Sequence, residues 1–255
     1  MSVTDDTARA GETTTTEVSA AGRAAIEIAD ARADAGAALR RLSHVLIGHE
    51  ASLDDLRALT DDLDANSARL GLNALRSRLA VQEGRDWATV PADGEAMFSY
   101  DDRPVSGRSA PWGMDLDVRR AGREVVATLT LGAAHEGAPG RSHGGVVAAL
   151  FDDVFGFVLD IESDLPAFTG ELTIRYERAT PLHTPLECRV RLEHRDGRKL
   201  HITGELTSDP VDGADERVVH ARSRALFITV NPETFLPAAP ISQPVALVPG
   251  TDATG

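Results

Sequence analysis

Residues 141–159 read RSHGGVVAALFDDVFGFVL, and this stretch decides the fold. A His-Gly-Gly turn opens it, and from Gly145 onward every position except two carboxylates is apolar or small. Wound as a helix, such a segment is apolar on nearly all sides, which is typical of a helix inside a protein. At about 15 residues it is too short to span a bilayer. We therefore predict a buried central helix over residues 143–159.

Two carboxylates, Asp152 and Asp153, conflict with this burial. A buried carboxylate is costly unless it is hydrogen-bonded, paired or used. Helical spacing surrounds Asp152 with the small residues Ala148, Ala149 and Gly156, which leave room for a ligand beside it. The alternative is a carboxylate satisfied by a backbone or hydroxyl donor. One member of the pair could also mark an edge that faces solvent or another subunit.

The turn His143-Gly144-Gly145 lies where the helix begins. Paired glycines allow a ligand to approach the free N–H groups of a helix start. These donors and the helix dipole favour an anion or a developing oxyanion. Turns into helices use glycine routinely, so the pair alone is a weak indication. A structural role for His143 stays open beside a catalytic one.

Composition limits the classes of function. A chain of 255 residues with 42% apolar residues predicts one sizeable domain or two small ones with a real core. The net charge of −14 argues against binding to nucleic acid or to an anionic membrane surface. Cys188 is the single cysteine, so an intramolecular disulfide and a Cys-based metal site are excluded. With no signal-peptide pattern and no membrane-spanning run, we expect a cytoplasmic protein.

The chain divides into four parts. Residues 1–20 are polar and Thr-rich, which predicts a disordered tail, and residues 231–255 form a Pro-rich tail. Residues 21–82 predict a helical extension whose second helix begins after Ser52, with Asp55 as its capping partner. The extension is either a packing or oligomerisation element, or a lid or partner-docking element. The remaining part holds the strands.

Residues 90–230 carry strand patterns on both sides of the central helix. Ala121-Gly122 and Asp196-Gly197 predict hairpin turns between neighbouring strands. Antiparallel strands that accompany one apolar helix must wrap it to bury it. We predict an α+β fold with a long antiparallel sheet around helix 143–159. The strand candidates are 114–118, 125–131, 168–178, 186–194, 200–207 and 218–230.

The combination of His143-Gly144-Gly145, an apolar helix and an Asp nine residues after the His resembles the hotdog-fold acyl-CoA thioesterases of the phenylacetate-pathway (PaaI-like) type. Residues 136–140 (EGAPG) resemble the loop before that His, and residues 169–178 (TGELTIRYER) resemble the strand after the helix. Residues 104–109 (PVSGRS) are similar to a segment of actinobacterial members. The resemblance covers roughly residues 96–230.

The resemblance implies a hotdog fold and hydrolysis of an acyl-CoA thioester without metal or cofactor. Asp152 matches the helix carboxylate, a nucleophile or a general base for water. Gly144 matches the residue whose backbone N–H polarises the thioester carbonyl, and His143 matches the residue that orients this site. Thr169 matches the hydroxyl residue that holds the attacking water.

In such enzymes the site lies between two subunits, which implies a homodimer or a dimer of dimers. Asp152 of one subunit would then face His143 and Gly144 of the other. Some members carry an Asn six residues before the His, but Gly137 stands at that position here. Substrate binding is expected at Gly145 and at basic side chains that meet the CoA phosphates. The basic candidates are Arg108, Arg141, Arg175 and Arg178, with Arg103, Arg198 and Lys199 as further unranked ones.

Two classes of function follow. The leading hypothesis is an acyl-CoA thioesterase that activates water with Asp152 and stabilises the oxyanion at the Gly144 N–H. The alternative is a non-catalytic acyl-CoA-binding or regulatory hotdog protein whose helical extension docks a partner, because one fold can host both classes. The joint presence of Asp152 and Thr169 favours the enzyme, while Gly137 and the extra helices keep the binder open.

Overall fold

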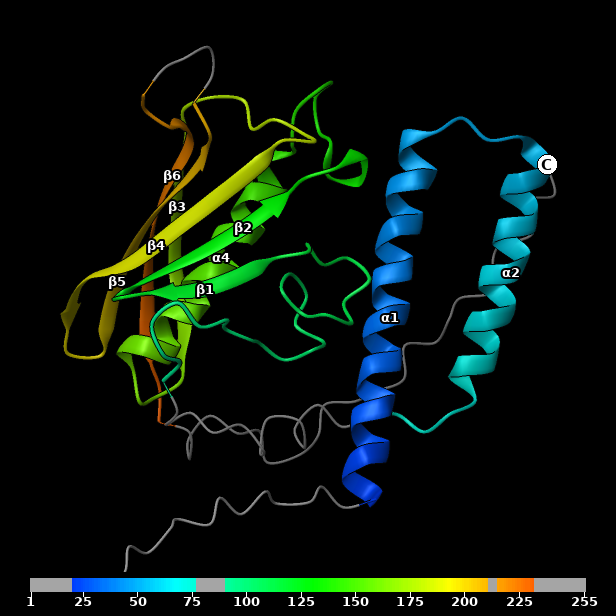
Figure 1. Ribbon diagram of the computed structural model, residues 1–255, viewed down its shortest axis with the longest axis horizontal. Helices are drawn as coiled ribbons and strands as arrows, with labels where there is room; N and C mark the ends of the chain where they lie inside the picture. Colours follow the sequence, from blue (N-terminus) through cyan, green and yellow to red (C-terminus); the bar gives the residue numbers. More distant parts are fainter. Residues whose placement is uncertain (1–19, 77–89, 211–214, 232–255) are drawn as a thin grey trace, which may run out of the picture.

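The computed structural model describes residues 20–76, 90–210 and 215–231. The predicted tails, 1–20 and 231–255, lie outside these residues except for one residue each, as do residues 77–82 of the predicted extension. The rest of the chain forms one curved sheet, a long helix behind it and two helices at its side (Figure 1).

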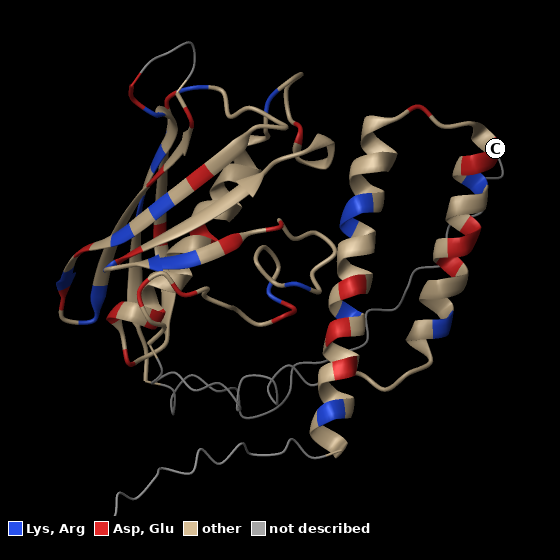
Figure 2. Cartoon of the chain, viewed as in Figure 1, with Lys and Arg blue, Asp and Glu red and all other residues tan. Residues whose placement is uncertain are grey.

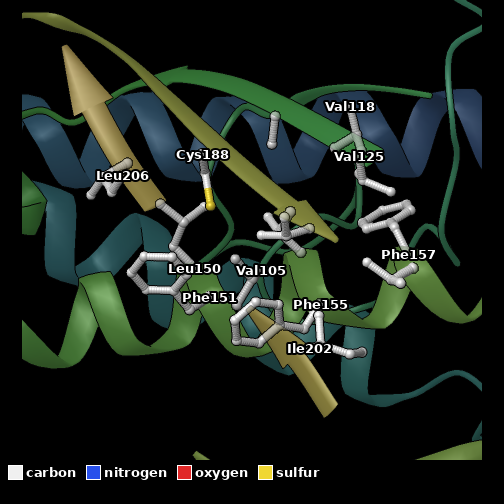
Figure 3. Packing of buried hydrophobic residues seen from close by; sticks show 14 of the residues in the cluster. Val105, Val118, Val125, Leu150, Phe151, Phe155, Phe157, Cys188, Ile202 and Leu206 are labelled. Carbon is white, nitrogen blue, oxygen red and sulfur yellow. The ribbon is translucent and has the colours of Figure 1, made fainter. Parts of the chain in front are cut away.

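The predicted central helix is helix α4, Gly144–Glu162. It begins after His143, whose extended backbone (φ −67°, ψ 136°) makes it the N-cap, and it runs three residues further than predicted. The helix is buried along most of its length because its apolar side chains face the sheet. Phe151, Phe155 and Phe157 are almost fully buried and pack against the strands (Figure 3).

Six antiparallel strands form a single sheet in the order β1-β2-β4-β5-β6-β3. Helix α4 contacts β2, β3, β4, β5 and β6, so the sheet curves around it as predicted (Figure 1). This confirms the α+β architecture. The strands are β1 (Asp117–Ala121), β2 (Glu124–Thr130), β3 (Ala167–Tyr176), β4 (Pro185–Asp196), β5 (Lys199–Ser208) and β6 (Val218–Thr229).

Two details of the predicted strands are wrong. The first strand was placed at 114–118 but starts at Asp117, because Met114 hydrogen-bonds to Val105 in the preceding loop instead of joining the sheet. The two-residue hairpin loops are Gly122-Arg123 and Gly197-Arg198, one position later than predicted. Each loop begins with a glycine at positive φ (64° and 55°), the conformation that tight hairpins require.

Helix α1 (Ala20–Gly48) is anchored to the sheet domain. The buried Arg40 donates through Nη1 to the carbonyl oxygens of Arg108 (2.9 Å) and Ala110 (2.8 Å). Its Nη2 lies 2.7 Å from Asp115 Oδ1. A guanidinium can satisfy several acceptors in a fixed fork, so one side chain holds the helix against this loop.

Helix α2 (Leu53–Gly71) is far less integrated. Ser52 caps it as predicted: Ser52 Oγ accepts a hydrogen bond from Asp55 N (3.1 Å) and donates to Asp55 Oδ2 (2.6 Å). None of its residues is buried, and the helix lies on the side of α1 away from the sheet (Figure 1). Acidic and basic positions are interspersed along both helices and across the sheet (Figure 2). The exposed apolar residues of α2 include Leu53, Leu56, Leu63 and Leu70.

Candidate active site

Asp152 and Thr169 are brought together at the surface of the domain. Thr169 Oγ1 in β3 donates a hydrogen bond to Asp152 Oδ1 in α4 at 2.7 Å, and both residues are exposed. The hydroxyl donor considered above as a structural alternative is therefore Thr169 itself. The pair presents one carboxylate and one hydroxyl side by side to solvent.

A β-bulge in β3 makes this pairing possible. Thr169 pairs with Phe227 and Glu171 with Leu226, so Gly170 is the extra residue of the bulge. In a regular strand, residues at an odd spacing point to opposite faces. Because the bulge shifts that alternation by one, Thr169 and Tyr176 both point toward α4.

Asp153 is buried in an ion pair, unlike its exposed neighbour Asp152. The side chain of Asp153 is buried, and Arg103 Nε lies 2.6 Å from its Oδ1 while Arg103 Nη2 donates to its backbone oxygen at 2.8 Å. Burial raises the pKa of the Asp153 carboxyl, and the Arg103 charge opposes that rise. The Arg103 guanidinium also fills the space at Gly156, so the prediction of ligand room there is wrong.

The two glycine amides at the start of α4 differ in availability. His143 Nδ1 accepts a hydrogen bond from the Gly145 N–H at 3.0 Å, so His143 caps the N-terminus of α4. This capping is the structural role that the sequence left open for His143. An accepting Nδ1 assigns the proton of the neutral imidazole to Nε2. Within the described residues nothing accepts a hydrogen bond from the Gly144 N–H, which is a free donor at the helix N-terminus.

Tyr176 lies at the candidate site, although the sequence did not indicate it. Its hydroxyl donates to the Gly144 carbonyl oxygen at 2.7 Å, and its ring lies against Gly144, where an added Cβ would meet the ring at 3.3 Å. The signal that could have found it is Gly170, because a glycine inside a strand pattern often marks a bulge that changes the facing residues.

A pocket of about 360 Å³ opens beside the start of α4. Its lining includes two basic residues, Arg141 and Arg178, together with Val147 and Tyr176. The other lining residues are Ser142, Gly144, Glu177, Ala179 and Thr180. A larger hollow of about 560 Å³ lies elsewhere, between β1, β2 and β4, and contains none of the predicted site residues.

The other two predicted arginines lie outside this pocket. Arg175 is 83% exposed, and its nearest acidic partner is Glu177 at 3.9 Å. Arg108 contacts Asp101 at 2.8 Å and Asp30 of α1 at 3.2 Å, and these partners raise its pKa. Arg108 therefore links the loop to α1 and does not join the residues around Gly144.

Gly137, six residues before His143, has no space for a side chain. A Cβ at this position would lie 2.7 Å from His143 Cα, a distance that requires the backbone to move. The Gly137 N–H instead donates to the Arg141 carbonyl oxygen at 3.0 Å, closing the loop before the helix. This position therefore offers no side chain that could hold a bound carbonyl.

The loop before α4 contains a short 3-10 helix, η1 (Ala133–His135), with a buried histidine. His135 Nδ1 accepts from the Gly132 N–H at 3.2 Å, and its ring meets the edge of His44 from α1 at 4.8 Å. Burial, and secondarily the charge of His44, lower the pKa of His135 from 6.5 to about 4. The neutral imidazole is therefore the folded-state form.

This shift predicts a pH dependence of stability. Since the folded pKa lies below the unfolded one, His135 contributes stability that is complete above pH 6.5 and is lost as pH falls to about 4. His135→Asn keeps an acceptor but does not titrate, so its melting temperature should fall less steeply than that of the parent in this window. Melting curves at several pH values measure the slopes, and equal slopes would contradict the assignment.

The fold and this arrangement can be compared with known proteins. Residues 140–213 match the model of the thioesterase superfamily. The chain contains a thioesterase superfamily domain. A crystal structure of another thioesterase superfamily protein aligns with it at a TM-score of 0.60 and 25% identity, covering 77% of this chain and 90% of that one. The hotdog fold implied by the sequence resemblance is thereby confirmed.

Curated relatives of the thioesterase superfamily domain are named acyl-coenzyme A thioesterases. THEM4 of Rattus norvegicus is 29% identical over 114 residues, which are 45% of this chain and 46% of the rat protein. THEM4 of Mus musculus is 32% identical over 109 residues, which are 42% of this chain and 44% of the mouse protein. Each match therefore spans less than half of the relative's length.

Over residues 20–76, 90–210 and 215–231, no helix has the length and hydropathy needed to cross a membrane. In the same ranges no three His, Cys, Asp or Glu side chains gather into a possible metal site.

Proposed function

We propose that the domain hydrolyses acyl-CoA thioesters to a carboxylic acid and CoA. The observation that carries this proposal is the hydrogen bond of 2.7 Å from Thr169 to the exposed Asp152. A surface carboxylate held by a hydroxyl is suited to position and deprotonate a water molecule. The names of the curated relatives support the thioester substrate.

In the proposed reaction Asp152 is either a general base for water or a nucleophile. As general base it removes a proton while the water oxygen attacks the thioester carbon, and collapse of the intermediate breaks the C–S bond. The CoA sulfur leaves with the electron pair of that bond and takes up the proton that Asp152 removed from water. As nucleophile, Asp152 would instead attack that carbon itself, and water would release the acid in a second step. Thr169 donates a hydrogen bond to Asp152, so the lone pairs of its oxygen remain to accept a hydrogen bond from water.

The oxyanion of the intermediate is assigned to the Gly144 N–H. This amide is a free donor at the positive end of α4, where negative charge is stabilised. Tyr176 donates to the Gly144 carbonyl and His143 accepts from the Gly145 N–H, so the turn is held from both sides. The donor therefore needs no rearrangement when charge develops.

One chain cannot complete this site. Asp152 lies eight residues beyond Gly144 in the same helix, a separation of about 12 Å at 1.5 Å per residue. Both groups must lie within about 3 Å of the reacting atoms. We therefore propose a homodimer, or a dimer of dimers, in which Asp152 of one chain faces Gly144 of its partner. The exposed edge strand β3, which carries Thr169 and Tyr176, is the side available for this assembly.

The pocket beside Gly144 is assigned to the substrate. Arg141 and Arg178 are the cations best placed for CoA phosphates, and Val147 and Tyr176 offer apolar contact to the chain that leads to the thioester. CoA phosphates are anionic, so a chain of net charge −14 needs such local cations.

A non-catalytic acyl-CoA-binding or regulatory protein is the second candidate. The observation that favours it is the exposed apolar side of α2, which fits a partner-docking element. Hydrolysis measured on acyl-CoA substrates of graded chain length, aliphatic and aromatic, separates the two functions. Turnover of any of them supports the enzyme, whereas binding of CoA esters without turnover would favour the binder.

Thr169→Val tests the water-holding role. Valine keeps the volume of threonine but removes the hydroxyl, so Asp152 loses its donor and the water loses a partner. We expect kcat to fall by about 10- to 100-fold with a much smaller change in KM. Steady-state kinetics measure both constants, and Thr173→Val, at an exposed position of the same strand, is the matched control. Parent-like kinetics in Thr169→Val would remove this residue from the site.

A further inference from the structure

Helix α1 reaches the loop that precedes the active-site turn. The Ala134 N–H of η1 donates to His44 Nδ1 of α1 at 3.0 Å, and the His44 ring packs edge-on against His135 at 4.8 Å. The approach is close, because a Cβ on Gly132 would lie 2.8 Å from His44 Nδ1. Gly48, at the end of the same helix, faces Ala133.

The same loop holds the start of α4. The His143 N–H donates to the His135 carbonyl oxygen at 2.9 Å, one peptide before the Gly144 amide. A continuous set of contacts therefore runs from His44 through η1 to the turn that presents the proposed oxyanion donor. No other described side chain of α1 hydrogen-bonds to η1.

A short 3-10 turn has poor hydrogen-bond geometry and does not hold its shape alone. Two ring nitrogens stabilise this turn: His44 Nδ1 accepts from the Ala134 N–H inside η1, and His135 Nδ1 accepts from the N–H of its N-cap residue Gly132. The first of them comes from outside the segment, at a sequence distance of 90 residues from Ala134. Removing it frees the loop to shift, and a displacement near 1 Å at a reacting group can cost about 100-fold in rate.

We propose that His44 of α1 is a positioning residue for the N-terminus of α4, acting through η1. The kinetic consequence rests on the proposed thioesterase function, while the structural consequence does not. On this assignment helix α1 helps to position the N-terminus of α4 and is more than an appended packing element.

The test compares three variants of the full chain. His44→Ala removes the acceptor, and His44→Asn restores an acceptor at about the place of Nδ1. His49→Ala is the control, because the His49 ring nitrogen Nδ1 hydrogen-bonds to the Val45 carbonyl oxygen of α1 and not to η1. Hydrogen exchange of the His143 amide, followed by NMR, reports the loop directly. Steady-state kinetics on an acyl-CoA report kcat and KM.

We expect His44→Ala to speed exchange at the His143 amide and to lower kcat by about 10- to 100-fold with little change in KM. His44→Asn should recover most of both losses, and His49→Ala should match the parent. Unchanged exchange at His143 in His44→Ala, or equal effects from His49→Ala, would overturn the proposal. If the parent hydrolyses no acyl-CoA, the thioesterase proposal fails, and the exchange measurement still decides the role of His44.

Discussion

Asp152→Asn is expected to lower thioester hydrolysis by about 10²–10⁴-fold while the fold stays intact. Asparagine keeps the shape of the side chain and can still accept the Thr169 hydrogen bond, so the local structure has no reason to change. What is lost is the negative charge that deprotonates water or attacks the thioester. Turnover on the best acyl-CoA substrate, with melting temperature and association state measured in parallel, checks this result.

Asp153→Asn is the matched control for this prediction. Asp153 is buried in an ion pair with Arg103, and breaking a buried pair by removing one charge costs about 3–5 kcal/mol. This variant should therefore melt lower than the parent but keep its turnover per folded molecule. If Asp153→Asn instead loses the chemistry and Asp152→Asn loses the stability, the two carboxylates have exchanged roles and the mechanism proposed here is wrong.

Gly144→Pro is expected to lower kcat by about 10²–10³-fold, the usual loss when one oxyanion donor is removed. Proline removes the N–H at the first position of a helix, the one helical position where it is well tolerated. The preceding His143 already has the extended backbone (φ −67°, ψ 136°) that a residue before proline adopts. The substitution thus deletes the donor and leaves α4 able to form.

Gly144→Ala separates the amide from the side chain. Both substitutions add a Cβ, which would lie 3.3 Å from the Tyr176 ring, but only proline lacks the N–H. Kinetics of the pair should show a large loss for proline and a small one for alanine, with circular dichroism as a check on the fold. Equal losses would indicate that crowding against Tyr176, and not the missing donor, is responsible.

The fold could be predicted because one apolar segment dictated it. A helix that is apolar on all sides must be covered by other parts of the chain. The apolar faces of the strands must also be buried, and the helix is the surface available to bury them, so α4 and the curved sheet could both be predicted. Because α4 is apolar on all sides, its sequence does not distinguish the environments of Asp152 and Asp153. Where every face of a helix is apolar, periodicity does not say which of two neighbouring carboxylates points to solvent and which meets Arg103.

Other parts of the site depended on contacts between distant segments. Gly156 suggested space for a ligand, but a side chain from residue 103 occupies it. Tyr176 joined the site only because of the bulge at Gly170, which a strict period of two does not anticipate. The arginines could not be ranked from spacing, since their distance to the pocket is set by the path of β3 and the following loop.

The separation of Gly144 and Asp152 along α4 has a consequence for how activity would depend on protein concentration. Asp152, near the middle of α4, and Gly144, at its N-terminus, serve different sites in the proposed dimer: each chain contributes Asp152 to one site and Gly144 to the other. In the proposed pair of chains, two complete sites exist, and a separated chain holds none. By mass action, dilution would then dissociate the dimer and abolish hydrolysis before the chains unfold. At low protein concentration, the rate of hydrolysis would rise more steeply than the concentration of chains.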